Sequence, residues 1–404
     1  AMRPDVLLAN NYQHVRGGSD RFYLEHARLL AERGHRVLQV ATRHPAAEAP
    51  HGPQRLLAPL ELARPGLADV GRFHRAARAR HAVEELLAER AGPLVAHLHI
   101  YHGQLTAAIL APLRAARVPI VQTLHEYKLF CPVSTFLSRG APCEACGRGS
   151  FWHAAARRCN RGSLLRSLVS ASESYVSRAL GALDAIDHFL APSAFLRAKM
   201  LAHGLAPERI TTLPYFVDTA RVAPSSARGE YFLYCGRLER LKGVLTLVRA
   251  AAHVPEVPLH LAGEGEARPE IEALLRQPAY RHVVLRGHLA GAELARELAG
   301  ALCVVQPSEW YENLPLAVLE ALAHGRAVLA SAIGGLPELV TDGDNGRLFP
   351  AGDEDALAAQ LRFAADSPDE LLRMGARGRA RAESEFSPAR HYDALLALYR
   401  RLVA

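Results

Sequence analysis

Apolar runs of strand length alternate with helix-length segments along the first half of the chain. The runs predicted as buried strands cover residues 5–10, 37–41, 94–99, 119–124 and 186–191. A helix is expected over about 20–33, with Ser19 as its N-cap and Gly34 at its end. This alternation predicts one doubly wound parallel sheet with crossover helices.

A second set of the same kind follows residues 214–229, where prolines, serines and glycine gather without a helical or strand period. We predict that this stretch is a linker. The strands expected beyond it cover 231–235, 259–262, 283–286, 303–306 and 327–330, and the chain ends in an amphipathic helix at 387–404. The sequence therefore predicts two Rossmann-like α/β domains, over residues 1–213 and 230–386. Ligands of open parallel sheets bind at the carboxyl ends of the strands, so the chemistry is expected on the loops that follow them.

The strongest group of polar residues follows the predicted strand 303–306. Asn313 is a suitable N-cap and Pro315 would lie in the first turn, so we expect a helix to begin there. Glu312 would lie at the helix mouth and Glu320 about two turns further on, roughly 10 Å away at 1.5 Å per residue. That separation suits the two ends of one long ligand, and the amides of the first turn favour an anion such as a diphosphate.

A cationic loop, residues 236–243, follows the predicted strand 231–235. Arg237 can bind phosphate oxygens through its forked guanidinium, and Lys242 offers a compact charge near a helix start. Lys242 is one of only three lysines in the chain. The alternative is an ordinary solvated loop.

These features resemble glycosyltransferase family 4, whose members have the GT-B fold. The resemblance rests on Glu312 and Glu320 with seven residues between them, on the loop 236–243 and on the Gly-Gly-Leu-Pro-Glu segment at 334–338. It covers nearly the whole chain. It implies two Rossmann-like domains that face each other across a cleft, an acceptor-side N-terminal domain, a donor-binding C-terminal domain, and a final helix that crosses back to the N-terminal domain.

The resemblance also implies a reaction, namely transfer of a sugar from a nucleotide diphosphate donor with retention at the anomeric carbon and without a required metal. Arg237 and Lys242 would neutralise the leaving diphosphate. Glu320 would hold the ribose hydroxyls, and Glu312 would position the donor sugar rather than attack it. The other implied donor contacts are the Gly17-Gly18 loop, the backbone of Asn313 and Leu314, the neighbourhood of Gly287 and His288 for the base, and His125 beside the sugar.

Single histidines are usually structural, and that alternative stays open for His125. His97, His99 and His102 are weaker candidates. His97 and His99 would share one strand face, and a zinc site in this set of three is a minor alternative.

Four cysteines lie in an insertion at about 130–162 that is rich in glycine, proline and arginine. Cys131 is followed by the Cys-x-x-Cys pair Cys143 and Cys146, and then by Cys159. Four thiolates suit a structural zinc, with an iron-sulfur cluster as the less favoured metal. Two disulfides or free thiols are the alternative.

The net charge of +7 on 404 residues is modest and does not indicate nucleic-acid binding. Arginines gather at Arg72, Arg75, Arg78 and Arg80, and again at Arg157, Arg158, Arg161 and Arg166. Each group is either a solvated helix face or a site that attracts anionic lipid headgroups or an anionic acceptor. No apolar run is long enough to span a bilayer and the start does not resemble a secretory signal, so we expect a cytoplasmic protein. The arginine groups add the alternative of a cytoplasmic protein held at the inner membrane face.

The function expected from the sequence is retaining sugar transfer to a glycan, a lipid-linked acceptor or a natural product in bacterial surface polysaccharide biosynthesis. The alternatives are another GT-B enzyme, such as a sugar phosphorylase or a nucleotide-sugar epimerase, and a zinc-stabilised nucleic-acid-binding protein. The last of these leaves Arg237, Lys242, Glu312 and Glu320 without a purpose.

Overall fold

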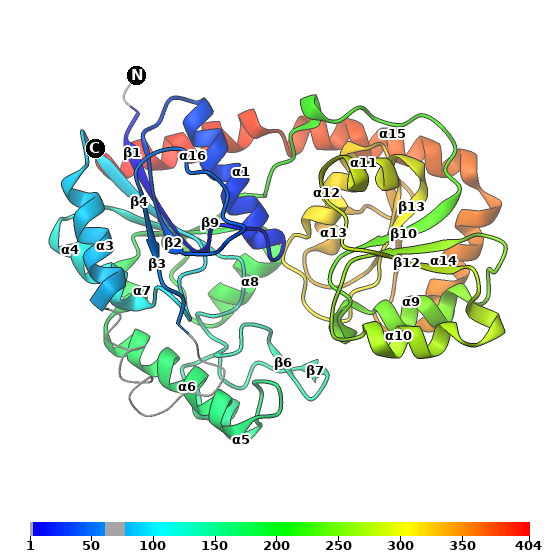
Figure 1. Ribbon diagram of the computed structural model, residues 1–404, viewed down its shortest axis with the longest axis horizontal. Coiled ribbons are helices and arrows are strands. Elements are labelled where there is room, and N and C mark those ends of the chain that lie inside the picture. Colours follow the sequence, from blue (N-terminus) through cyan, green and yellow to red (C-terminus); the bar gives the residue numbers. More distant parts are fainter. Residues whose placement is uncertain (1–2, 61–76) are drawn as a thin grey trace. The chain divides into compact units, whose positions relative to one another are not determined.

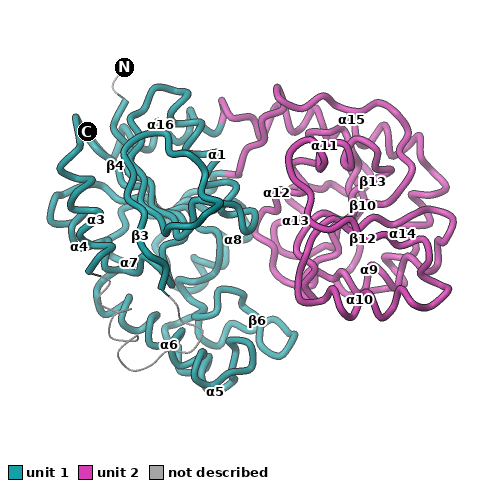
Figure 2. The backbone as a smooth tube through the Cα atoms, in the orientation of Figure 1, with its two compact units in different colours: residues 1–213, 391–404 teal, residues 214–390 magenta. Residues whose placement is uncertain are grey.

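The computed structural model describes residues 3–60 and 77–404 of the chain. The chain forms two compact units, each with its own parallel sheet (Figure 2). Unit 1 contains residues 1–213 and 391–404, and unit 2 contains residues 214–390.

Unit 1 is built on a seven-stranded sheet in the order β3-β2-β1-β4-β5-β8-β9, and every pair in it is parallel. The strand order reverses between β1 and β4, the kind of place where open α/β sheets bind ligands. The strands are β1 (Asp5–Tyr12), β2 (Val37–Thr42), β3 (Gln54–Leu57), β4 (Leu94–Leu98), β5 (Ile120–Thr123), β8 (His188–Ala191) and β9 (Ile210–Thr212) (Figure 1).

The described helices of unit 1 include the last helix of the chain, α16. They are α1 (Gly18–Glu32), α3 (Ala77–Ala88), α4 (Leu110–Ala115), α5 (Trp152–Ala156), α6 (Leu164–Ala179), α7 (Ala182–Ala185), α8 (Ala194–Ala202) and α16 (Pro388–Val403), with 3-10 turns η1 (Ala107–Ile109) and η2 (Pro207–Arg209). Two buried tyrosines join α16 to this unit. The Tyr392 hydroxyl lies 2.9 Å from Nε2 of His35, and the Tyr399 hydroxyl lies 2.5 Å from Nδ1 of His97.

Unit 2 holds a six-stranded parallel sheet in the order β12-β11-β10-β13-β14-β15, which reverses between β10 and β13. Its strands are β10 (Tyr231–Cys235), β11 (Leu259–Ala262), β12 (Val283–Gly287), β13 (Ala301–Gln306), β14 (Val328–Ser331) and β15 (Gly346–Phe349). Its helices are α9 (Val244–Ala251), α10 (Arg268–Leu275), α11 (Gly291–Gly300), α12 (Leu316–Ala323), α13 (Leu336–Leu339), α14 (Glu354–Asp366) and α15 (Pro368–Glu385), with η3 (Thr219–Arg221), η4 (Arg240–Lys242) and η5 (Pro278–Tyr280). The apolar faces of β10, β11 and β13 pack with α9, α14 and α15 into one core.

The stretch 214–229, predicted as a linker, is tied to unit 2. The guanidinium of Arg326, almost fully buried, donates to the Ala227 carbonyl (2.9 Å) and to Ser225 Oγ (2.5 Å). Arg379 on α15 donates to the carbonyls of Val222 (2.8 Å) and Thr219 (2.9 Å). Because its carbonyls are bound by two arginines of unit 2, this stretch is an ordered strap rather than a free connector.

Several local expectations were wrong. Helix α1 begins at Gly18 with Gly17 as its N-cap, and Ser19 does not cap it. Strands β3, β9 and β15 were not predicted, nor was the two-stranded antiparallel sheet of β6 (Leu137–Ser138) and β7 (Ala141–Pro142) in the insertion. Strand β9 has only three residues and β3 is half-buried along its whole length, so neither shows the apolar run of a central strand.

Arg72 and Arg75 of the first arginine group lie outside the described residues, whereas Arg78 and Arg80 lie on α3. Among the helices of residues 3–60 and 77–404, none combines the length and the apolar character needed to cross a membrane.

Candidate functional site

The loops after β10 and β13, on either side of the strand reversal in unit 2, pack directly on one another. Gly243 has a positive φ of +68°, and a Cβ there would lie 1.8 Å from the Pro307 carbonyl oxygen. The Glu309 amide donates to the Leu241 carbonyl at 2.9 Å. A glycine is therefore required at 243 for the cationic loop to reach the loop that carries Glu312.

Lys242 and Glu312 form a buried ion pair at this contact, 2.7 Å from Nζ to Oε1. The lysine side chain is 13% exposed and the glutamate side chain 5%. Ser308 Oγ donates to the same carboxylate oxygen at 2.6 Å, and Nζ lies 4.8 Å from the centre of the Trp310 ring. The sequence singled out both charges but gave no sign that they would pair.

The electrostatics keep this glutamate ionised. Burial would raise the pKa of Glu312, but the Lys242 ammonium and the hydrogen bonds from Lys242 and Ser308 outweigh it, so the pKa lies below its ordinary value. A general acid needs a raised pKa, and a nucleophile must be exposed to the reacting carbon. The arrangement therefore suits a group that holds Lys242 and orients a ligand.

The segment 334–338 fixes the backbone of Glu312. Gly334 has φ +62°, and a Cβ there would lie 2.3 Å from the Glu312 carbonyl oxygen and 2.6 Å from its nitrogen. The next amide, of Gly335, donates to that same carbonyl at 2.7 Å. The paired glycines thus let two loops come close enough to set the direction of one side chain.

Arg237 differs from Lys242 in exposure. Its side chain is 53% exposed and its Nη1 lies 2.6 Å from Oε1 of Glu239. The Tyr234 hydroxyl donates to the Arg237 carbonyl at 2.7 Å, which holds the loop backbone. One cation is thus on the surface of the site and the other is inside it.

Helix α12 begins later than expected. It starts at Leu316 with Pro315 as its N-cap and no side-chain cap, so the expectation that Asn313 caps it was wrong. Asn313 and Leu314 are buried in the turn before the helix. Glu320, half-buried on α12, adds to burial in raising the pKa of Cys235, which places its carboxylate near the end of β10.

The predicted contact with the base of the donor, at Gly287 and His288, lies at the end of β12. Gly287 has φ +68°, and its carbonyl accepts from the Gly263 amide at 2.7 Å. His288 is exposed next to it. A Cβ at Gly263 would lie 1.8 Å from the Gly236 carbonyl, so this glycine lets the β11 loop contact the cationic loop.

In unit 1, His125 ends a row of hydrogen-bonded histidines. Nδ1 of His99 lies 2.8 Å from Nε2 of His125, and Nε2 of His99 lies 3.1 Å from Nδ1 of His26. Burial lowers the pKa of His125 to about 3 and lowers the pKa of His26 and His99 well below the ordinary value. These imidazoles are therefore neutral at pH 7. His125 also lines a small pocket with Gln122.

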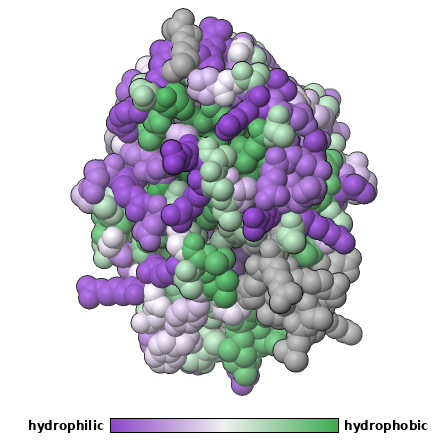
Figure 3. All heavy atoms as spheres, turned by 90° about the vertical axis from the view of Figure 1, so that its left-hand side faces the viewer, coloured by the Kyte–Doolittle hydropathy of each residue, from purple (hydrophilic) through white to green (hydrophobic). Residues whose placement is uncertain are grey.

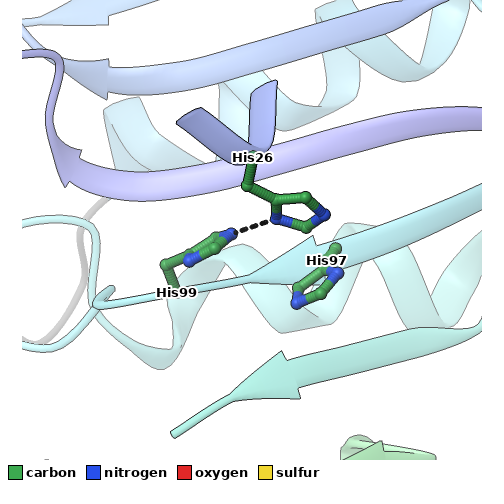
Figure 4. Close-up of side chains that lie close together, drawn as sticks. All are labelled: His26, His97 and His99. Carbon is green, nitrogen blue, oxygen red and sulfur yellow. Dashed lines mark hydrogen bonds between the residues drawn. The ribbon is translucent and has the colours of Figure 1, made fainter. Parts of the chain in front are cut away.

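His26, His97 and His99 form the one set of three among the described residues whose ligand nitrogens lie within 4.8 Å of one another (Figure 4). Both nitrogens of His97 are already engaged, with the hydroxyls of Tyr399 (2.5 Å) and Thr123 (2.7 Å). The set is thus a hydrogen-bonding network. The minor zinc alternative of His97, His99 and His102 was wrong in its members, because His102 is not part of this set. The sequence did not single out His26, which comes from α1.

At the tip of the N-terminal loop, Gly17 caps α1 and Gly18 is its exposed first residue. A Cβ at Gly17 would meet nothing within 4 Å among the protein atoms.

The four insertion cysteines form no disulfide among the residues that the structure describes. Burial raises the pKa of Cys146 to about 12, and Cys131, Cys159 and Cys143 add to that shift. Nη1 of Arg157 lies 2.8 Å from Sγ of Cys143, and Sγ of Cys159 lies 3.7 Å from Ser138 Oγ. No three of the four place their sulfurs within 4.8 Å of one another among the residues that the structure describes.

Two protein-family models match this chain, each over a different part of it. A family model described as Glycosyltransferase Family 4 matches residues 16–221, and one described as Glycosyl transferases group 1 matches residues 229–366. MMP alpha-(1->4)-mannosyltransferase of Mycolicibacterium hassiacum is 34% identical over 50% of this chain and 50% of its own. A glycogen synthase of Mycobacterium tuberculosis is 30% identical over 73% of this chain and 65% of its own. The matched part thus spans about half to two thirds of these relatives.

Solved structures share the architecture over almost the whole chain. Sucrose-phosphate synthase of Thermosynechococcus elongatus superposes with a TM-score of 0.74 at 21% identity and covers 99% of both chains. Anabaena HepE in complex with UDP and glucose gives a TM-score of 0.73 at 17% identity, covering 99% of this chain and 100% of its own. The two parallel-sheet units therefore have the GT-B fold, and with both family models matching, the chain belongs to glycosyltransferase family 4.

Proposed function

We propose that this protein transfers a sugar from a nucleotide diphosphate donor to an acceptor hydroxyl, with retention at the anomeric carbon. The observation that carries the proposal is the Lys242–Glu312 pair at the strand reversal of unit 2, next to the exposed guanidinium of Arg237. Relatives named as a mannosyltransferase and as synthases of glycogen and maltose-1-phosphate support this reaction class.

The proposed chemistry is mainly electrostatic. As the glycosidic bond to the diphosphate breaks, negative charge grows on the leaving phosphate, and Arg237 and Lys242 stabilise it. Asn313 and Leu314 offer backbone amides, Glu320 holds the ribose hydroxyls, and the base lies near Gly287 and His288. The acceptor attacks from the face that the diphosphate leaves, and the departing phosphate takes the acceptor's proton.

Glu312 is assigned a positioning role. Its carboxylate is bound by Lys242 and Ser308, so it orients the ammonium and offers its remaining acceptor capacity to a donor-sugar hydroxyl. In unit 1 we assign His125 a polar contact beside the donor sugar, made as a neutral imidazole because burial lowers its pKa to about 3. Gly17 and Gly18 are assigned a backbone approach to the diphosphate, which a side chain would hinder. No metal is required in this scheme.

A glycan or lipid-linked acceptor in bacterial surface polysaccharide biosynthesis is the acceptor class that we propose. The solved structure of WaaG, a glycosyltransferase involved in lipopolysaccharide biosynthesis, supports it by likeness of fold, with a TM-score of 0.66 at 16% identity. A sugar phosphorylase and a nucleotide-sugar epimerase remain the alternative enzymes of this fold.

Product analysis tests the proposal. The protein is incubated with UDP-, GDP- and ADP-sugars and a set of glycan and lipid-linked acceptors, and products are followed by NMR. We expect a new glycoside whose anomeric configuration equals that of the donor. Consumption of inorganic phosphate with release of a sugar phosphate would identify a phosphorylase, and an inverted anomer would contradict the proposal.

We also propose that Cys131, Cys143, Cys146 and Cys159 hold a structural zinc. The donor set of four thiols in one small module fits this metal. No three of the four sulfurs lie within 4.8 Å of one another among the described residues, so binding of the metal would have to draw them together. Metal analysis of protein purified without chelators should find about one zinc per chain, lost when Cys143 and Cys146 are both replaced by serine. Iron with sulfide would indicate a cluster instead, and four titratable thiols without metal would contradict the proposal.

A further inference from the structure

Large exposed apolar side chains gather on one short part of unit 1. Of the eight large hydrophobic residues that are exposed among the described residues, six lie between residues 152 and 180, on α5, on α6 or just after α6. They are Trp152, Leu164, Leu165, Leu168, Tyr175 and Leu180. Figure 3 shows hydrophobic residues at the lower end of the molecule, where Figure 1 places α6.

Helix α6 has its apolar side turned outward. Leu164, Leu168 and Tyr175 are spaced i, i+4 and i+11, which places them on one face, and Leu165 lies beside them. The buried residues of α6 are the small Ser167, Ala171 and Ser174 and the glutamate Glu173, which pairs with Lys128. An ordinary surface helix shows the opposite arrangement, with its apolar stripe buried. The outward face of α6 is therefore suited to an apolar environment rather than to water.

Trp152 extends this face. Its backbone amide donates to the Tyr175 hydroxyl at 3.1 Å, so the start of α5 lies against the far end of the α6 stripe. The indole is 55% exposed and Tyr175 is 43% exposed. Tryptophan and tyrosine are the residues that favour the boundary between water and lipid.

Exposed arginines precede the apolar stripe of α6 in the chain. Arg157, Arg158 and Arg161 are exposed in the turn that joins α5 to α6, directly before Leu164. None of the three forms an ion pair with a carboxylate from residues 3–60 or 77–404. Arginine next to exposed leucine and aromatic rings matches the chemistry of an anionic lipid surface, with headgroups on the guanidinium groups and acyl chains on the leucines.

We propose that α5, α6 and the turn between them form a docking surface for anionic membrane. A second copy of the chain fits less well, because a two-fold contact through this face would offer the arginines no carboxylate, since Glu173, the only acidic residue between 152 and 180, is buried. The inference deepens the proposed function, since it would bring the protein to lipid-linked acceptors, but its test needs neither donor nor acceptor.

The test is flotation of the full chain with vesicles of phosphatidylcholine alone or mixed with phosphatidylglycerol. We expect binding to the anionic vesicles only, weakening as salt is added. Replacing Arg158 and Arg161 by glutamine should weaken binding by about 30-fold, at roughly 1 kcal/mol per arginine. The pair L164S and L168S should weaken it by about tenfold or more. Matched controls are R373Q on α15 and V284S on β12, both exposed in unit 2.

Fluorescence gives a second readout that does not depend on folding yield. In a Trp310→Phe variant, Trp152 is the only tryptophan of the chain. Its emission should shift to the blue with anionic vesicles and be quenched by brominated lipid. Equal binding to both vesicle types, an unchanged Trp152 signal, or native binding by the leucine variant would overturn the proposal. So would a concentration-dependent dimer that the leucine variant abolishes, because the face would then be a self-interface.

Discussion

Replacing Lys242 by methionine is expected to abolish sugar transfer and to lower the free energy of unfolding of unit 2 by about 3–5 kcal/mol. Methionine keeps the packing of the lysine stem but removes the ammonium 2.7 Å from the Glu312 carboxylate. That carboxylate would be left buried with hydrogen bonds from Ser308 and Gln306 but without a countercharge. The loss follows from the uncompensated charge, and urea unfolding at pH 7 measures it.

A double variant separates stability from chemistry. K242M combined with E312Q leaves no buried charge at this loop contact, so most of the lost stability should return while turnover stays absent. R237M removes a cation that is half exposed and should change stability by less than about 0.5 kcal/mol, although it also impairs turnover. R240M, on an exposed arginine of the same loop, is the matched control for both measurements. If K242M has the same free energy of unfolding as the native chain, the Lys242–Glu312 pair does not stabilise this loop contact.

Lowering the pH from 7 to 5 is expected to destabilise unit 1 far more than unit 2. Burial lowers the pKa of His26, His97 and His99 well below the ordinary value and that of His125 to about 3. The charged groups that shift the pKa of His26 are other histidines, including His391 on α16 and His35, so they lower its pKa further.

The direction of this pH effect follows from proton uptake on unfolding. Each of these histidines binds a proton in the unfolded chain below about pH 6.5 but stays neutral in the folded unit, so the stability present above pH 6.5 is lost as the pH falls. The loss is about 1.4 kcal/mol per pH unit for each histidine that stays neutral.

Urea unfolding followed by Trp152 fluorescence, with Trp310 replaced by phenylalanine, reports the stability of unit 1. The variant H26F should reduce the slope of stability against pH by one histidine, whatever it does to stability at pH 7. The exposed His81 on α3 provides the control substitution, H81Q, which should leave the slope unchanged. If the free energy of unfolding does not change between pH 7 and 5, the row of histidines is already protonated or hydrated in the folded unit.

The central strands were predictable because they are buried on both faces and appear as continuous apolar runs. Residues 231–235 and 259–262 match β10 and β11 at both ends. Three of the four edge strands were not predicted, since β3 is paired on one side only, β9 has three residues and β15 begins at Gly346, whereas the edge strand β12 was expected over 283–286. Strand ends carry the loops that hold the polar groups, so the position of the candidate site followed from the central strands alone.

The contacts inside the site could not be predicted. Gly243 and Gly334 allow loops distant in the sequence to touch, and the Lys242–Glu312 pair joins residues that are 70 positions apart. The two N-cap predictions were wrong for a related reason. Asn313 is drawn into the buried turn before α12, and Gly17 rather than Ser19 begins α1. Tertiary packing decided these positions, and local sequence preference did not.

The central claim is that the loops after β10 and β13 bind the diphosphate of the donor. Calorimetric titration of the native chain with UDP, GDP and ADP, beside R237M and K242M, tests it most directly. We predict that one nucleotide binds at one site per chain and that each variant weakens it by about 10- to 100-fold, the worth of a charge-assisted hydrogen bond. Binding of equal strength to the native chain and both variants would contradict the claim.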